Sequence, residues 1–217
     1  MPLNRPGWDA RPISVFRIAE TMRVILFMSL AIVVFNFYPV TAVMIIILAL
    51  LNDIPILAIA YDNASVAKSP VRWNMREVLI VASVLGLAGV ASSFLIFFIL
   101  QRMGLSRDVI QAIIFLKLDV AGHSTIYVTR AGRRHFWHKP YPSWKLLLPA
   151  LSTRIFGTLI ACYGLFMPAI GWEWVGWIYL YATAWFVFND FLKVWTYKLL
   201  DGFQERSHRN ARAHEAR

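Results

Sequence analysis

The chain has 217 residues, of which 59% are hydrophobic and 16% are charged. A single soluble core cannot bury that much apolar surface, so the composition excludes an ordinary soluble domain and favours a protein embedded in a lipid bilayer. The net charge of +10 would also suit nucleic-acid binding, but loops that face anionic lipid explain it with fewer assumptions. We therefore expect no nucleic-acid partner.

Apolar windows of about 20 residues, which as helices cross a hydrocarbon layer of roughly 30 Å, recur along the chain. The predicted spans are residues 14–35, 40–61, 77–100, 109–129, 146–166 and 175–199. The predicted fold class is therefore all-α, a polytopic bundle of six transmembrane helices. The predicted domains are an N-terminal cytoplasmic segment (1–13), a six-helix transmembrane domain (14–200) and a cytoplasmic tail (201–217).

Basic residues are unevenly distributed between the two sides of the predicted bundle. Most of the 22 Lys and Arg residues lie near the start of the first span or follow the second, fourth and sixth spans. The opposite side receives Arg102 and Arg107, while Arg23, Lys117 and Arg154 fall within spans. The positive-inside rule then predicts a multi-pass membrane protein with both termini in the cytoplasm.

The second span contains a polar interruption in the stretch LLNDIPILAIAYDN, residues 50–63. Pro55 lacks an N–H group and its ring clashes one turn back, so we predict that this helix is unwound near Asn52–Pro55. Irregular backbone at membrane depth is tolerated where it lines a cavity or an ion site. Asp53 is therefore the leading candidate for an ion-binding residue, with Asn52 beside it.

A basic partner for Asp53 is predicted from depth. Asp53 and Arg23 each lie roughly 12 to 14 Å from the cytoplasmic ends of antiparallel neighbouring spans, so we expect them to meet. Moving a guanidinium away from a buried carboxylate changes the affinity of that carboxylate for a proton, as a proton carrier requires. The alternative interpretation is a static buried ion pair that fixes the register of the two helices.

The fourth span carries a secondary polar cluster. Asp119 and His123, spaced i,i+4, share one helix face, whereas Lys117 and Asp119 do not. A proton relay is one interpretation, but a packed interhelical polar cluster is favoured because nothing nearby breaks the helix. Arg154 and Asp190 are interpreted as structural residues within reach of the interface. We expect no metal site.

Five stretches carry a resemblance to a known family and occur in its order: RIAETMRVILF, LLNDIPILAIAYDN, KSPVRWNMREVL, IYVTR and GWEWVGWIYLYATAWFVFNDFLK. In these motifs, over about residues 16–202, the chain resembles the last six transmembrane helices, M5 to M10, of plasma-membrane proton-pumping P-type ATPases. The resemblance implies a plasma-membrane location. It also implies that Asp53 matches the proton acceptor of the family and that Arg23 matches its moving counter-charge.

The sequence also departs from this family. Its phosphorylation motif DKTGT, its TGE motif and its GDGxND motif do not occur in the sequence, and nothing matches its first four helices. We therefore expect no catalytic residue and no cofactor in this chain, with ATP and Mg²⁺ bound only by a missing N-terminal half.

The expected function is that of the membrane half of a P-type proton or cation transporting ATPase, as a truncated or split chain that is inactive alone. Its expected partners are the lipid bilayer and either a separate N-terminal ATPase half or a complete pump. The alternative is a stand-alone, non-catalytic membrane protein, either a passive proton or cation pathway or an assembly partner.

Cysteine-accessibility labelling in intact cells checks the predicted sidedness. Single cysteines within residues 63–74 or in the tail should be protected from an impermeant reagent added outside, and a cysteine at Ser106 should react. Cys162 lies within a span, and its replacement by alanine provides the unlabelled background. Labelling of the tail from outside would contradict the predicted orientation.

Overall fold

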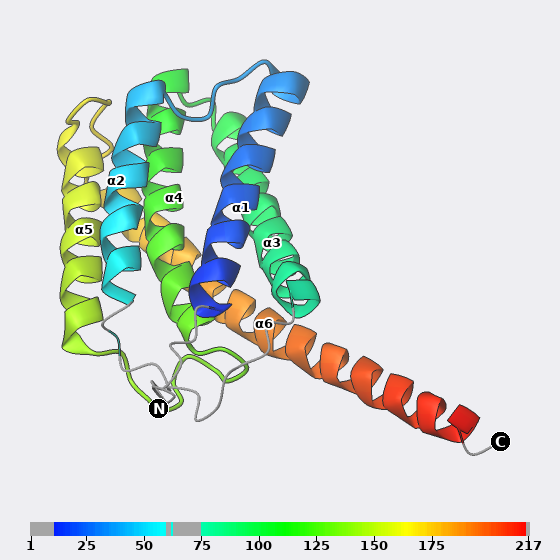
Figure 1. Ribbon diagram of the computed structural model, residues 1–217. Coiled ribbons are helices and arrows are strands. Elements are labelled where there is room, and N and C mark those ends of the chain that lie inside the picture. The colour runs from blue at the N-terminus through cyan, green and yellow to red at the C-terminus, as the bar shows by residue number, and fades with distance from the viewer. Residues whose placement is uncertain (1–10, 60–61, 63–74, 216–217) are drawn as a thin grey trace.

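The computed structural model of the chain describes residues 11–59, 62 and 75–215. All regular secondary structure within these ranges is helical, as Figure 1 shows. The helices are α1 (Arg11–Phe35), α2 (Ala42–Ile59), α3 (Met75–Arg102), α4 (Arg107–Arg130), α5 (Trp144–Tyr163) and α6 (Gly171–Glu215). The prediction of an all-α polytopic bundle is confirmed. Most of the predicted segment 1–13, the end of the second predicted span and the connection 63–74 lie outside the described residues.

Five of these helices, α1 to α5, are long and apolar enough to cross a membrane. The sixth predicted span lies within α6, which is helical but is not among these five, because Trp, Tyr and charged residues interrupt its apolar run. Its 45 residues correspond to about 67 Å, roughly twice the thickness of a hydrocarbon core. The helix continues past the predicted boundary at residue 200, and its C-terminal end extends beyond the bundle (Figure 1).

The α4 helix lies at the centre of the bundle. It contacts α1, α2, α3, α5 and α6, whereas α1 packs mainly against α3, and α2 mainly against α5. Residues 112–116 of α4 are completely buried. Polar groups on α4 are therefore enclosed by protein, and they determine what chemistry the interior of the bundle can hold.

Two buried ion pairs hold the connection between α4 and α5 against the neighbouring helices. Arg130, at the end of α4, donates from Nε to the Asp62 carboxylate at 2.6 Å, and Asp62 also accepts from the backbone N–H of Ser143 at 2.8 Å. On α6, Asp190 accepts from Lys193 at 2.8 Å and contacts His135 of the connection at 2.6 Å. These contacts tie α2, α5 and α6 to the same end of α4.

The predicted unwinding of the second span is wrong. The α2 helix runs without interruption from Ala42 to Ile59, with Pro55 inside it. Proline removes only its own backbone donor outright, and transmembrane helices tolerate it where neighbouring helices enclose the site. Here Leu51 and Pro55 are buried on a helix that packs against both α4 and α5. Packing therefore outweighs the local preference of Pro55 for a break.

A test of the packing between α1 and α3 follows from Gly86. A Cβ atom at this position would lie 3.1 Å from Met22 Cβ and 3.2 Å from the Ala19 carbonyl oxygen, so Gly86→Leu should force the two helices apart. Overpacking of this kind costs about 1–3 kcal/mol, and we expect a matching loss of unfolding free energy in detergent. Gly176→Leu on α6, where nothing lies within 4 Å, is the matched control. Equal stability of the two variants would contradict this packing.

Candidate functional site

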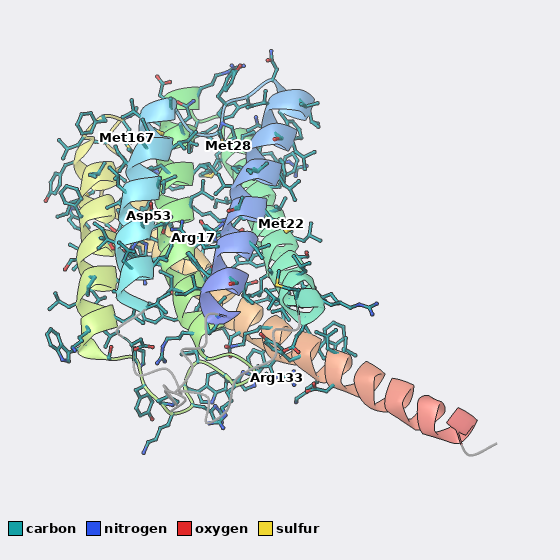
Figure 2. All side chains as sticks on the ribbon, in the orientation of Figure 1. Arg17, Met22, Met28, Asp53, Arg133 and Met167 are labelled. Atoms are coloured by element: carbon teal, nitrogen blue, oxygen red, sulfur yellow. The ribbon has the colours of Figure 1, made fainter. Side chains whose placement is uncertain are left out.

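Asp53 lies on the outer surface of the bundle, on the side of α2 that faces α1. We call this surface, which carries Asp53 and Arg17, the flank. The Asp53 carboxylate pairs with Arg17 of α1, with 2.9 Å between Oδ1 and Nη1. About half of each side chain is exposed, 50% for Asp53 and 52% for Arg17. Figure 2 shows the two side chains pointing toward one another across the space between α2 and α1. The Asp53 carboxylate is thus paired with a guanidinium group and is also accessible from outside the bundle.

Arg23, the partner expected for Asp53, points elsewhere. Its Nη2 group pairs with Glu20 and donates to the carbonyl oxygen of Leu118 on α4 at 3.3 Å. The stem of Arg23 passes over Gly89 of α3, where an added Cβ atom would lie 2.5 Å from the arginine Cδ. The structure therefore does not bring Asp53 and Arg23 together.

The physical reason is that depth does not fix direction around a helix axis. Arg17 and Arg23 are six residues apart, which turns their side chains by about 240° relative to one another. Only one of them can face α2. The long arginine side chain also allows Arg17, which lies nearer the end of its helix, to reach a carboxylate that lies closer to the middle of the membrane span. No signal in the sequence selects Arg17 over Arg23, because direction around the helix axis is set by packing between helices.

Asn52 points into the bundle, whereas the neighbouring Asp53 is half exposed. The Asn52 side chain is 9% exposed and lies against Gly122 of α4, where an added Cβ atom would be 2.7 Å from Asn52 Oδ1. That oxygen has no hydrogen-bond partner among the described residues. Asn52 thus presents a free acceptor to the interior of the bundle, between α2 and α4.

The fourth helix carries three ionisable side chains into the core. Lys117 is 1% exposed, and its Nζ donates to Ser93 Oγ on α3 at 2.5 Å. Asp119 and His123 are both completely buried, with 3.5 Å between Asp119 Oδ1 and His123 Nδ1. The predicted shared face of Asp119 and His123 is therefore present, while Lys117 points toward a different helix.

Thr153 of α5 completes the polar cluster and was not identified from the sequence. Its hydroxyl oxygen lies 2.7 Å from His123 Nε2. Thr153 does not belong to a recognisable sequence motif, so no signal in the sequence distinguishes it from other threonines. Its role depends on the way in which α5 packs against α4.

These residues form a gradient of exposure from the flank to the core. Asp53 and Arg17 are half exposed, Glu20 and Arg23 are 14% and 5% exposed, and Asp119 and His123 are fully buried. Each ionisable group in a membrane span costs about 2.5 to 3.5 kcal/mol at the helix centre on insertion scales. Each of these groups therefore needs a compensating partner or access to water.

The site contains no obvious place for a metal ion. Among the described residues, no group of three or more His, Cys, Asp or Glu side chains is arranged to hold one. The chemistry that the described residues offer is the binding and release of protons by carboxylate and imidazole groups, under the influence of nearby guanidinium groups.

Comparisons with known proteins identify the relatives of this chain. No family model matches it. It is 50% identical over 181 residues to a putative cation-transporting ATPase of Methanocaldococcus jannaschii, covering 83% of this chain and 22% of the relative. It is 28% identical over 158 residues to plasma membrane ATPase 2 of Schizosaccharomyces pombe, covering 70% of this chain and 15% of the relative. It is 22% identical over 198 residues to probable proton ATPase 1A of Leishmania donovani, covering 77% of this chain and 20% of the relative.

The chain therefore spans between 15% and 22% of the length of these curated relatives. This proportion and its apolar helices are consistent with a membrane segment of a longer protein, as the motifs predict. The homologues of this multi-pass membrane protein are P-type cation-transporting ATPases, and the predicted resemblance to them is confirmed.

Proposed function

We propose that this chain is the part of a P-type cation-transporting ATPase that carries the ion through the membrane, with Asp53 as the ion-binding residue. The observation that supports it best is the half-exposed Asp53–Arg17 ion pair. It lies on helices apolar enough to span a bilayer, and Leu50 and Leu57 are exposed one turn to either side of Asp53. A charged pair that faced hydrocarbon there would be costly, so this flank borders water or further protein.

The proposed ion is a proton. A carboxylate beside a guanidinium is held in its ionised form, and withdrawal of the guanidinium favours uptake of a proton. Arg17 is the counter-charge of Asp53 in the arrangement described here, while Arg23 is held by Glu20 and the Leu118 carbonyl. The name of the Leishmania relative, a probable proton ATPase, agrees with this choice of ion.

The energy for transport would come from other parts of the pump. Phosphoryl transfer requires a nucleotide site, magnesium and an acceptor residue in one arrangement, and the motifs that supply them in the resembled family do not occur in this sequence. We propose that the flank carrying Asp53 and Arg17 packs against that remaining part, whether as a separate chain or as a complete pump. The plasma membrane is the proposed location, with both termini cytoplasmic.

Proton flux in reconstituted vesicles tests the role of Asp53. The chain is fused to the matching N-terminal region of a related pump, and ATP-driven flux and folded yield are measured together. Asp53→Asn should abolish flux without loss of folded protein, because an amide does not exchange a proton at any accessible pH. Asp108→Asn makes the same chemical change at an exposed carboxylate and should leave flux unchanged.

A structural ion pair predicts a different result for the same residues. Removing one partner of this half-exposed pair would then lower stability only slightly, and the Asp53→Asn, Arg17→Gln double variant would retain flux. Transport by the double variant would reject Asp53 as the proton carrier.

ATP turnover by the 217-residue polypeptide alone tests the division of labour. We expect no ATP hydrolysis and no acyl-phosphate after incubation with labelled ATP, because the chemistry depends on groups supplied by other parts of a pump. The fusion protein described above is the positive control. Vanadate-sensitive hydrolysis by this chain on its own would overturn the proposal.

A further inference from the structure

The contact between His123 and Thr153 is compatible with two hydrogen-bond arrangements. His123 Nδ1 lies 2.8 Å from the backbone carbonyl oxygen of Asp119, so Nδ1 carries a proton and donates to that oxygen. Thr153 Oγ1 lies 2.7 Å from His123 Nε2 and 2.9 Å from the carbonyl oxygen of Pro149. The threonine hydroxyl can therefore donate either to the imidazole or to the Pro149 carbonyl.

These alternatives correspond to two protonation states of the imidazole. In the neutral state, the Thr153 hydroxyl donates to Nε2. When a proton binds at Nε2, the bond from Thr153 to Nε2 breaks, Nε2–H donates to Thr153 Oγ1, and the hydroxyl hydrogen turns to the Pro149 carbonyl. Each state has a partner for every polar hydrogen of the ring. The buried histidine can thus gain or lose a proton without leaving an unpaired donor, which is the usual penalty in a core.

Asp119 provides the negative charge next to this imidazole. Neither of its carboxylate oxygens has a hydrogen-bond partner among the described residues, and the side chain is completely buried. Gly157 of α5 makes room for it, since an added Cβ atom there would lie 2.6 Å from Oδ2. A buried carboxylate without donors is costly to keep charged, so Asp119 needs a cation nearby or a proton of its own.

We propose that Asp119 and His123 together form a proton-binding site in the core of the bundle, holding one exchangeable proton on either the carboxyl group or Nε2. The site is separate from Asp53, and nothing in its geometry depends on the function proposed above. Only its use in transport, as a second proton-binding position inside the bundle, rests on that proposed function.

The surrounding charges allow this proton to leave. Arg154 of α5 acts through space on both Asp119 and His123, and Glu20 of α1 acts on Asp119. Arg154 is the cation that would stabilise the carboxylate after proton loss, and its Nε atom is itself buried without a partner. The Arg154 guanidinium also lies over the ring of Tyr179, 4.6 Å from the ring centroid, which holds the cation in this region.

The other groups that face α4 have partners of their own. Lys117, on α4 itself, contacts Ser93 of α3, and the charged groups of α1 and α2 in this region are Arg23, paired with Glu20, and Asp53, paired with Arg17. From α6, Lys193 contacts the carbonyl of Val128 near the end of α4, beyond His123, and pairs with Asp190. Arg154 and Glu20 are therefore the charges expected to influence the Asp119–His123 site.

Infrared spectroscopy of the purified full chain tests the proposal directly. Spectra are recorded from acidic to alkaline pH, and the carbonyl stretch of a protonated carboxyl group is followed. We expect a carboxyl band that is lost as the pH rises and that is absent from Asp119→Asn at every pH. Asp108→Asn, at an exposed carboxylate, should retain this band. An Asp119-dependent band that stays constant at every pH, or no such band at any pH, would overturn the proposal.

Two variants at Thr153 supply a measurement that does not require Asp119→Asn to fold. Thr153→Val removes the acceptor for Nε2–H, so the proton should stay on the carboxyl group and the carboxyl band at low pH should be stronger than in the parent chain. Thr153→Ser keeps the hydroxyl and should restore the parent profile. Identical profiles for valine and serine would contradict a shared proton. None of these measurements involves Asp53 or ATP. They can therefore fail while the proposed function of Asp53 stands, and they can succeed if that function is rejected.

Discussion

The arrangement of this bundle depends on the free-energy cost of keeping charge away from water. Ionisable side chains in membrane spans persist only where a counter-charge, a hydrogen-bond partner or a wet surface compensates for lost hydration. Two side chains of the central helix, α4, meet this condition through neighbouring helices: Ser93 of α3 contacts Lys117, and Thr153 of α5 contacts His123. Because α4 contacts all five other described helices, the partners of its polar residues also determine how those helices pack.

The end of the bundle at which α4 meets α5 is held in a different way. There, Asp62 and Arg130 have side-chain exposures of 0% and 3%, and Asp190 and Lys193 are similarly buried. Removing one partner from such a pair leaves an uncompensated charge, so each pair fixes the ends of its helices firmly. The polar groups deeper in the span have unpaired atoms instead, on Asp119, Asn52 and Arg154. Paired charges are thus concentrated at one end of the bundle, while Asp119, Asn52 and Arg154 carry unpaired polar atoms deeper in the span.

The sequence predicts the helices well because hydrophobic length is a property of each segment alone. Every predicted span coincides with a helix, within a few residues at most ends, and only α6 is much longer than expected. Direction around a helix is harder to predict, because it is set by packing between helices. For this reason the shared face of Asp119 and His123, which lie on one helix, was predicted correctly, whereas the pairing of Asp53 with Arg23, on two helices, was not. Pro55 shows the same limit, since local chemistry predicted a break that the neighbouring helices suppress.

The α1 helix connects the exposed flank with the buried core. Arg17, Glu20 and Arg23 recur at intervals of three residues, with Arg17 facing Asp53 and Arg23 facing the backbone of α4 at Leu118. Gly86 and Gly89 of α3 allow this helix to approach closely and give the Arg23 stem its space. A displacement of α1 would therefore change two environments at once: it would move the cation away from Asp53, and it would shift Glu20 and its negative charge relative to Asp119. In a transporter, such a single rigid element can couple the uptake of a proton at the flank to events in the core, because both sites respond to the same movement.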